Sequence, residues 1–214
     1  MKLYVMPGAC SQASHIALLW AGAPFELVVL SHAEAGGDAY ATINPKRAVP
    51  ALALKDGAVI TESLAVLEYI ADAHPEARLG AAPGDVLERA RLNEALADLV
   101  SNVHAAWAPI FVPSRFIGAE AQFDAVRQAA FAQLDKHYHR LDALMKARAW
   151  MVADRRTVAD AYLYVMCTWK GKTATPLARY PALQAFKTRL ETDACVQRAV
   201  TAEQAPAPAD QKRA

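Results

Sequence analysis

Hydrophobic and polar residues alternate along the first 70 residues in a pattern that predicts short strands separated by helices. Gly22 follows the first apolar helical run, and Asp56-Gly57 separates two short apolar runs as a hairpin turn does. The pattern predicts a β-α-β-α-β-β-α order, with a parallel strand pair followed by an antiparallel hairpin. The expected strands are residues 2–6, 25–30, 51–54 and 58–61, and the clearest helices are residues 10–21 and 64–73.

The rest of the chain shows helical periodicity. Residues 74–85 contain two prolines and two glycines and predict a linker. Thr157 and Asp160 have the Thr-x-x-Asp spacing of a capping box, which places a helix start at Thr157. Other helices are expected from about residue 85 to 110, at 121–148 and at 184–190. We therefore expect domains at residues 1–78 and 85–202, and a frayed tail at 203–214.

Composition favours a compact protein with no charged macromolecular partner. The chain has 214 residues, a formal net charge of +1 and 54% hydrophobic residues, enough to bury a core in one or two domains. Acidic and basic residues are intermixed, which argues against nucleic-acid binding. The apolar run at residues 3–6 is too short for a signal peptide, and no apolar window is long enough for a membrane span.

Cysteine usage indicates a reducing compartment. Cys10, Cys167 and Cys195 form an odd and widely scattered set, so a disulfide framework is not expected. We predict a cytoplasmic protein.

Residues 49–63 carry the first sign of a binding site. Pro50 has no N–H to give to a sheet, so the backbone at Val49 can stay free to pair with an extended ligand. Glu62-Ser63 opens an apolar helix, which brings a carboxylate, a hydroxyl and free helix N–H groups together. Such a place can hold the amino group and the carboxylate of one short peptide, and glutathione carries both.

Cys10 supplies the complementary chemistry. It begins the first predicted helix, and a helix N-terminus lowers a thiol pKa and favours the thiolate, in Cys10 or in a bound thiol ligand. The alternative is that Cys10 is simply a small buried residue. Ser11 suits a helix cap better than a nucleophile, although its hydroxyl can also donate a hydrogen bond to the thiol.

Several dispersed motifs in the same order resemble bacterial beta-class glutathione S-transferases. They are Met1-Lys2-Leu3-Tyr4, Pro7-Gly8-Ala9-Cys10-Ser11, His15-Ile16-Ala17-Leu18, Asn44-Pro45-Lys46, Val49-Pro50-Ala51-Leu52, Thr61-Glu62-Ser63-Leu64-Ala65, Leu67-Glu68-Tyr69-Ile70, Trp150, and Thr157-Val158-Ala159-Asp160-Ala161-Tyr162. The resemblance covers residues 1 to about 200. It implies an α/β thioredoxin-like N-terminal domain followed by an all-α C-terminal domain, the glutathione S-transferase fold.

The resemblance also implies the site residues. Glutathione would be the co-substrate, with no metal, and the chain would form a homodimer through its long helices. Ser101 would reach toward the glutathione of the partner subunit, and His104 would face the cleft, although a lone helical histidine is usually a surface or packed residue. The implied catalytic residues are Cys10, Ser11 and His104, and the implied binding residues are Cys10, Val49, Pro50, Glu62, Ser63, Ser101, Asn102 and His104.

The chain departs from the family pattern in its cations. Ala105 follows His104 where a lysine is frequent, and residues 31–38 hold only His32 as a cation. This predicts glutathione binding that is weaker or differently arranged. His137 and His139 lie on a helix beside acidic residues, but we expect a solvated surface there and no metal site.

Three activities remain open from the sequence. A glutathione thiolate could attack a small apolar electrophile. The candidates for the walls of the electrophile pocket are Phe111, Phe116, Tyr162 and Trp169, although core packing suits most of them better. Cys10 could instead form a mixed disulfide with glutathione, as a thiol transferase does. The third possibility is a non-enzymatic regulator with the same fold. A dithiol mechanism is excluded because residues 10–13 lack a second cysteine.

Overall fold

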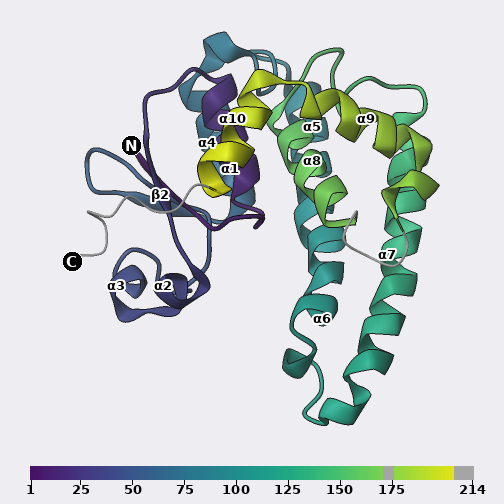
Figure 1. Cartoon of the computed structure of the whole chain (residues 1–214). Coiled ribbons are helices and arrows are strands. Elements are labelled where there is room, and N and C mark those ends of the chain that lie inside the picture. The colour runs from purple at the N-terminus through teal and green to yellow at the C-terminus, as the bar shows by residue number, and fades with distance from the viewer. Residues whose placement is uncertain (171–175, 205–214) are drawn as a thin grey trace. The chain divides into compact units, whose positions relative to one another are not determined.

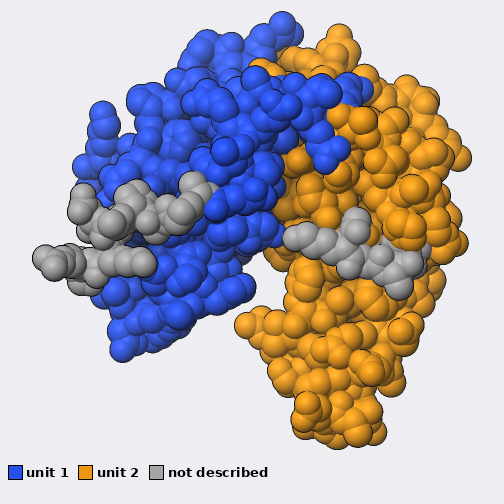
Figure 2. All heavy atoms as spheres, in the orientation of Figure 1, with its two compact units in different colours: residues 1–80, 189–214 blue, residues 81–188 orange. Residues whose placement is uncertain are grey.

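A computed structural model describes residues 1–170 and 176–204. The chain forms two compact units, residues 1–80 with 189–214 and residues 81–188 (Figure 2). The first boundary falls inside the predicted linker. The second boundary differs from the prediction: the expected helical domain extends to residue 202, whereas the chain from residue 189 groups with the first unit.

The first unit is built on a four-stranded sheet in the order β2-β1-β3-β4. Strand β1 (Lys2–Val5) pairs in parallel with β2 (Glu26–Val29) and antiparallel with β3 (Ala51–Ala53), which forms a hairpin with β4 (Val59–Thr61). The hairpin turn uses Gly57 at φ 91°, a conformation that glycine adopts readily. These pairings confirm the predicted parallel pair and antiparallel hairpin.

Helix α1 (Gln12–Trp20) contacts both α4 (Ser63–Ala73) and α10 (Ala194–Gln204) (Figure 1). The predicted stop at Gly22 is confirmed: its φ is 63°, and its N–H donates to the Leu19 carbonyl at 3.2 Å. The second helix of the predicted order is divided into α2 (His32–Gly36) and α3 (Asp38–Ala41). A short 3₁₀ turn, η1 (Pro75–Ala77), follows α4.

The second unit consists of helices within its described residues. The predicted long helix is a succession of α5 (Val86–Asp98), the π-helical segment η2 (Leu99–His104), the 3₁₀ turn η3 (Ala105–Trp107) and α6 (Ala108–Phe111). Its buried stripe contains Leu92, Leu96, Leu99, Val103 and Trp107. The remaining segments are η4 (Pro113–Arg115), η5 (Glu120–Gln122), α7 (Phe123–Met145), α8 (Val158–Lys170), η6 (Leu177–Arg179) and α9 (Pro181–Glu191).

The start of α8 is fixed by a buried carboxylate. Asp160 accepts hydrogen bonds from the Thr157 N–H at 2.8 Å, from the Thr157 hydroxyl at 2.9 Å and from the Met151 N–H at 2.9 Å. The first of these bonds, from the Thr157 N–H to the Asp160 carboxylate, is the one that a capping box predicts, and it is confirmed. The Thr157 hydroxyl donates to that carboxylate, and the Asp160 N–H donates to the Thr157 carbonyl instead.

The end of the described chain differs from the expected frayed tail. Glu203 lies in α10 and is 1% exposed. Its carboxylate accepts a hydrogen bond from the Gln12 amide at 3.0 Å and contacts the His15 ring at 3.0 Å, which ties α10 to α1. Residues 205–214 lie outside the described residues. No helix in the described part of the chain has the length and apolarity needed to cross a membrane.

Candidate active site

Cys10 lies in the turn between β1 and α1, two residues before the helix begins. Its side chain is buried, and its thiol donates to the Val49 carbonyl at 3.4 Å. The Val49 carbonyl therefore already has a partner inside the protein, which corrects the expectation that the whole backbone at Val49 is free. Val49 precedes the β3 ladder, which starts at Ala51, and the Val49–Pro50 peptide is cis.

The Cys10 thiol is less acidic than predicted. Burial raises its pKa above the ordinary thiol value, and the nearby Glu62 carboxylate acts in the same direction. The hydroxyl of Ser63 and the N–H groups of Cys10 and Ser11 oppose this rise but do not reverse it. The expected thiolate is therefore wrong for the unliganded protein, because desolvation outweighs the field at the helix end.

Ser11 is fully buried at the N-cap position of α1, but its side chain makes no capping bond. Its hydroxyl accepts from the Met6 N–H at 3.2 Å. The expectation of a side-chain cap is therefore wrong, because the hydroxyl is used to connect the end of β1 to the turn that carries Cys10.

Glu62 adopts an unusual backbone conformation at the start of α4. Its φ is 72° and its ψ is 127°, a region that costs a residue with a side chain about 1–3 kcal/mol. The strain turns the chain abruptly between β4 and α4, so that a carboxylate comes directly before the N–H groups of an 11-residue helix. Ser63, the first residue of that helix, is buried. Backbone strain of this kind is concentrated at functional sites.

A cation that the sequence does not predict lies at this place. The ammonium group of Lys46 contacts the Glu62 carboxylate and lies 3.4 Å from the Thr61 hydroxyl. The family pattern directs attention to residues 31–38 for this cation, but Lys46 stands in the Asn44-Pro45-Lys46 motif instead. The available signal was therefore the motif itself.

The loop that carries Lys46 is held by its own hydrogen bonds. The Tyr40 hydroxyl and the Asn44 amide both donate to the Ala48 carbonyl, at 2.7 and 2.6 Å. Arg47, at φ 54°, donates to the Asp38 carboxylate at 2.7 Å. These bonds fix the chain just before Val49.

His104 lies in the second unit, at the end of η2. Its Nδ1 is 2.5 Å from the Tyr162 hydroxyl, and its ring meets the edge of Trp169 with centroids 4.9 Å apart. Burial lowers the pKa of His104 below the ordinary histidine value, so the ring is neutral at pH 7.

The four aromatic candidates divide into two kinds. Tyr162 and Trp169 are buried, as core residues are. Phe111 and Phe116 are 53% and 55% exposed. Phe111 also stacks on the buried Trp107, with ring centroids 5.3 Å apart, so one apolar face is held in place while the side chain remains open to solvent.

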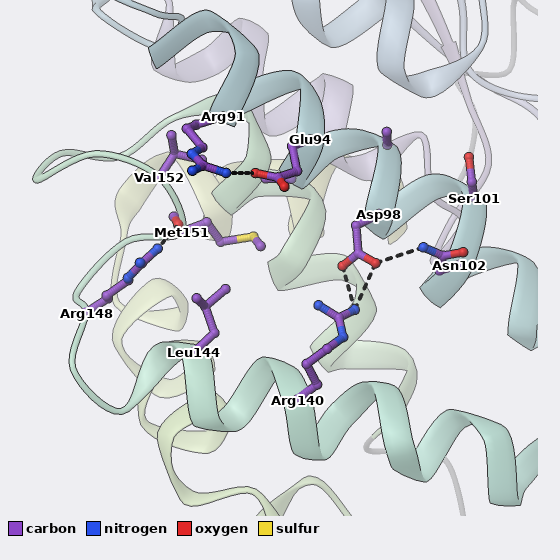
Figure 3. Close-up of a pocket in the computed structure, with 12 residues that line it drawn as sticks. Arg91, Glu94, Asp98, Ser101, Asn102, Arg140, Leu144, Arg148, Met151 and Val152 are labelled. Carbon is purple, nitrogen blue, oxygen red and sulfur yellow. Dashed lines mark hydrogen bonds and ion pairs between the residues drawn. The ribbon is translucent and has the colours of Figure 1, made fainter. Parts of the chain in front are cut away.

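Ser101 and Asn102 line a polar groove of about 900 Å³ in the second unit (Figure 3). The Asn102 amide donates to Asp98 at 2.9 Å, and the Arg140 guanidinium donates to both oxygens of Asp98 at 2.8 and 2.6 Å. Ser101 and Asn102 are exposed, whereas His104 is held by Tyr162. The structure therefore does not place these three predicted binding residues in one cluster.

The helix surface around His137 and His139, where no metal site is expected, has contacts of its own. Asp135 accepts a hydrogen bond from the Tyr180 hydroxyl and lies 3.3 Å from the His139 ring. Over residues 1–170 and 176–204, no group of three or more histidine, cysteine or acidic side chains is arranged to hold a metal ion.

Comparison with known proteins identifies the family to which the chain belongs. The glutathione S-transferase N-terminal domain model matches residues 8–73, and the glutathione S-transferase C-terminal domain model matches residues 96–193. The chain is 38% identical to glutathione S-transferase GST-4.5 of Xanthomonas campestris, over 95% of this chain and 98% of that protein. It is 35% identical to glutathione S-transferase GstA of Escherichia coli O157:H7, again over 95% of this chain and 98% of that protein.

Solved structures show the same similarity. A sphingomonad glutathione S-transferase complexed with glutathione has 38% identity and a TM-score of 0.86, covering 95% of this chain and 98% of that one. The chain belongs to the glutathione S-transferase family. Within that family it is similar to the bacterial beta class: the Sphingomonas chungbukensis beta-class enzyme has 37% identity and a TM-score of 0.86, covering 95% of this chain and 99% of that one.

Proposed function

We propose that this glutathione S-transferase joins the glutathione sulfur to small, apolar electrophiles. The observation that carries the proposal is the strained Glu62 at the N-terminus of α4, followed by Ser63, whose hydroxyl acts to lower the pKa of the Cys10 thiol. Peptide-binding chemistry and thiol chemistry therefore meet within one unit of the protein.

The γ-glutamyl end of glutathione would be held at the start of α4. Its carboxylate suits the free N–H groups of the helix and the Ser63 hydroxyl, and its amino group suits the Glu62 carboxylate. Lys46 supports this arrangement because its ammonium group contacts Glu62 and fixes the orientation of the carboxylate. The cysteinyl backbone of glutathione would pair with the Val49 N–H, and with the Val49 carbonyl once the Cys10 thiol turns to the bound sulfur.

The sulfur of glutathione would then lie near Cys10 and Ser11. In conjugation, the bound thiol loses its proton to solvent, the sulfur forms a bond to an electrophilic carbon, and the leaving group departs with the electron pair of the broken bond. Cys10 has a raised pKa and is a neutral thiol at pH 7, so when glutathione binds, its S–H can turn from the Val49 carbonyl and donate to the glutathione thiolate.

The raised pKa of Cys10 makes thiol transfer through Cys10 the second candidate function. Thiol transfer through a Cys10–glutathione disulfide needs Cys10 as a thiolate, and burial disfavours that state. A regulator without activity is also a weaker reading, because strained backbone of the kind seen at Glu62 is concentrated at functional sites.

Two features of the second unit support an apolar electrophile. Phe111 and Phe116 expose aromatic surface that a planar or aliphatic substrate can cover. His104, a neutral ring at pH 7, would act as a hydrogen-bonding group toward the reacting sulfur.

We also propose a homodimer that uses the exposed sides of α5 and α7. The groove between these helices carries Ser101, Asn102 and the Asp98–Arg140 pair, which offers charged and polar groups to a second copy (Figure 3). In such a dimer Ser101 would act toward the glutathione of the partner subunit. The three free cysteines support a reducing cytoplasm, where the enzyme would remove reactive electrophiles.

The test measures retention on glutathione resin and conjugation of a panel of halogenated aromatics and epoxides. We expect the wild type to bind, to elute with free glutathione and to conjugate at least one panel compound. Glu62→Ala should lose retention. Glu26→Ala is the matched control, because Glu26 is also an exposed carboxylate paired with a lysine, Lys2, and it should bind like the wild type. A wild type that neither binds nor conjugates would favour the regulator.

A further inference from the structure

The hydroxyl of Tyr162 forms a hydrogen bond with the ring of His104, which the proposed function uses. We propose that the Tyr162 hydroxyl is a positioning group that holds His104 as the neutral tautomer with its proton on Nε2. The inference rests on the proposed function for its catalytic meaning, but the tautomer itself can be measured without any activity.

The geometry leaves the His104 ring little freedom. The Tyr162 hydroxyl lies 2.5 Å from Nδ1, and the Tyr162 side chain is fully buried in α8. Trp169 lies further along the same helix, and its ring packs edge-to-face with the His104 imidazole, with ring centroids 4.9 Å apart. One helix therefore fixes both the hydrogen bond and the plane of the ring.

The direction of this hydrogen bond follows from the two groups. A phenol O–H is a better donor than a neutral imidazole N–H, and an imidazole nitrogen is a better acceptor than a phenol oxygen. Tyr162 therefore donates and Nδ1 accepts. A nitrogen that accepts carries no proton, so in the neutral ring the proton is on Nε2.

The local backbone brings His104 to this partner. The π-helical segment η2 ends at His104 and contacts α8. Val103 and Trp107, on the same side of the chain, are buried and anchor the segment before and after the histidine. Wider helical turns of this kind are frequent at functional sites.

The fixed tautomer decides what His104 can do in conjugation. With Nδ1 engaged, its remaining polar group is the Nε2 N–H, which can donate to a sulfur anion but cannot take a proton from a thiol. In the proposed function, His104 would then donate a hydrogen bond to the glutathione thiolate, and the thiol proton would leave to solvent. Tyr162 would act through His104 and not on the sulfur itself.

The direct test is the tautomer of His104 in the ¹⁵N-labelled protein without ligand, read from long-range ¹H–¹⁵N correlations at neutral pH. His104→Gln identifies the signals by removing them. We expect an unprotonated Nδ1 and a protonated Nε2 in the wild type. A proton on Nδ1 in the wild type overturns the inference, and this result needs no variant to fold.

Tyr162→Phe should remove the bias, so that both tautomers are populated. Tyr138→Phe is the matched control: Tyr138 is also fully buried in this unit, and its hydroxyl donates to the Met166 carbonyl at 2.6 Å. It should leave the His104 tautomer unchanged. Wild-type signals in a folded Tyr162→Phe protein would contradict the proposal.

Kinetics then separate this inference from the proposed function. Tyr162→Phe should lower kcat/KM for conjugation about fivefold, the equivalent of one neutral hydrogen bond, and shift its pH profile to higher pH. Tyr138→Phe should keep the wild-type profile. A wild type without conjugating activity would contradict the proposed function while the tautomer result stands. An active wild type whose profile Tyr162→Phe leaves unchanged would contradict the inference.

Discussion

At the scale of single residues, Cys10 shows how two opposing effects on a thiol are resolved. Its position before α1 and its bonds from backbone N–H groups favour the thiolate, but the side chain is buried and burial favours the neutral thiol. Burial has the larger effect, so Cys10 suits hydrogen-bond donation better than nucleophilic attack.

The raised pKa makes a prediction about alkylation. Without glutathione, Cys10 should react with iodoacetamide more slowly than an ordinary thiol at pH 7, and its rate should still be rising at pH values where an ordinary thiol has reached its plateau. Peptide mass spectrometry after timed quenching measures Cys10 separately from Cys195. A rate for Cys10 that is already maximal at pH 7 would contradict the assignment.

Removing the thiol distinguishes the two enzymatic mechanisms. Cys10→Ala should abolish glutathione-dependent disulfide reduction but lower conjugation only in part, about fivefold if the lost group is one hydrogen-bond donor to the thiolate. The two activities are measured on the same preparations. Equal disulfide reduction by Cys10→Ala and wild type would exclude a covalent role for Cys10.

Residue types and motifs predicted some of the site but not all of it. Cys10, Glu62 and Ser63 could be chosen because each stands at a predicted helix start. Lys46 and Tyr162 were not given these roles, because their partners depend on backbone paths through a strained residue and a π-helical segment that sequence periodicity does not encode.

At the scale of elements, buried carboxylates hold helix ends. Asp160 satisfies two backbone N–H groups and one hydroxyl at the start of α8. Asp160→Ala should lower the free energy of unfolding by about 3 kcal/mol, because it leaves buried donors unpaired. Urea denaturation measures this, with Asp124→Ala as a control, since Asp124 forms an exposed ion pair with Arg127. A similar small effect of both changes would contradict the role of Asp160.

Glu203 makes the equivalent connection for α10. Glu203→Ala should destabilise the first unit by about 3 kcal/mol, because His15 and Gln12 lose a buried partner. Amide hydrogen exchange in α10 should accelerate as well. Gln204→Ala changes the neighbouring exposed residue and should have little effect on either measurement. Unchanged exchange in Glu203→Ala would show that other contacts hold this helix.

Helices and strands were largely predictable because their signals are local. Gly22 ends α1, and Asp56-Gly57 forms the hairpin turn, as expected. The predicted element order includes a second helix without giving its bounds. The Ser-x-x-Glu spacing of Ser31 and Glu34, which form a capping box, marks the start of α2 in the sequence. Glu203 was misplaced because its burial depends on His15, 188 positions earlier in the chain.

At the scale of the whole molecule, the chain returns to its first unit after the helical one. Residues 1–80 and 189–214 form one unit, and the order of elements alone does not reveal this return. The family resemblance indicated two domains, but the boundary near residue 189 comes from contacts between α1 and α10.

The proposed dimer is tested by mass in solution. Light scattering should give twice the mass of one chain for the wild type. Arg140→Glu should shift the equilibrium toward monomer, because it reverses a charge and breaks the pair with Asp98 in the groove. Arg115→Glu makes the same charge change at an exposed residue of the same unit that does not line the groove, and it serves as the control. A monomeric wild type would exclude the dimer.

The central claim is that glutathione binds with its γ-glutamyl end at Glu62 and Ser63 and its sulfur beside Cys10. A crystal structure of the protein with glutathione tests this most directly. We expect the γ-glutamyl carboxylate on the N–H groups of α4, the amino group on Glu62 and the sulfur within hydrogen-bonding reach of the Cys10 thiol. Glutathione bound elsewhere, such as in the groove at Asp98 and Arg140, or with its sulfur away from Cys10, would contradict it.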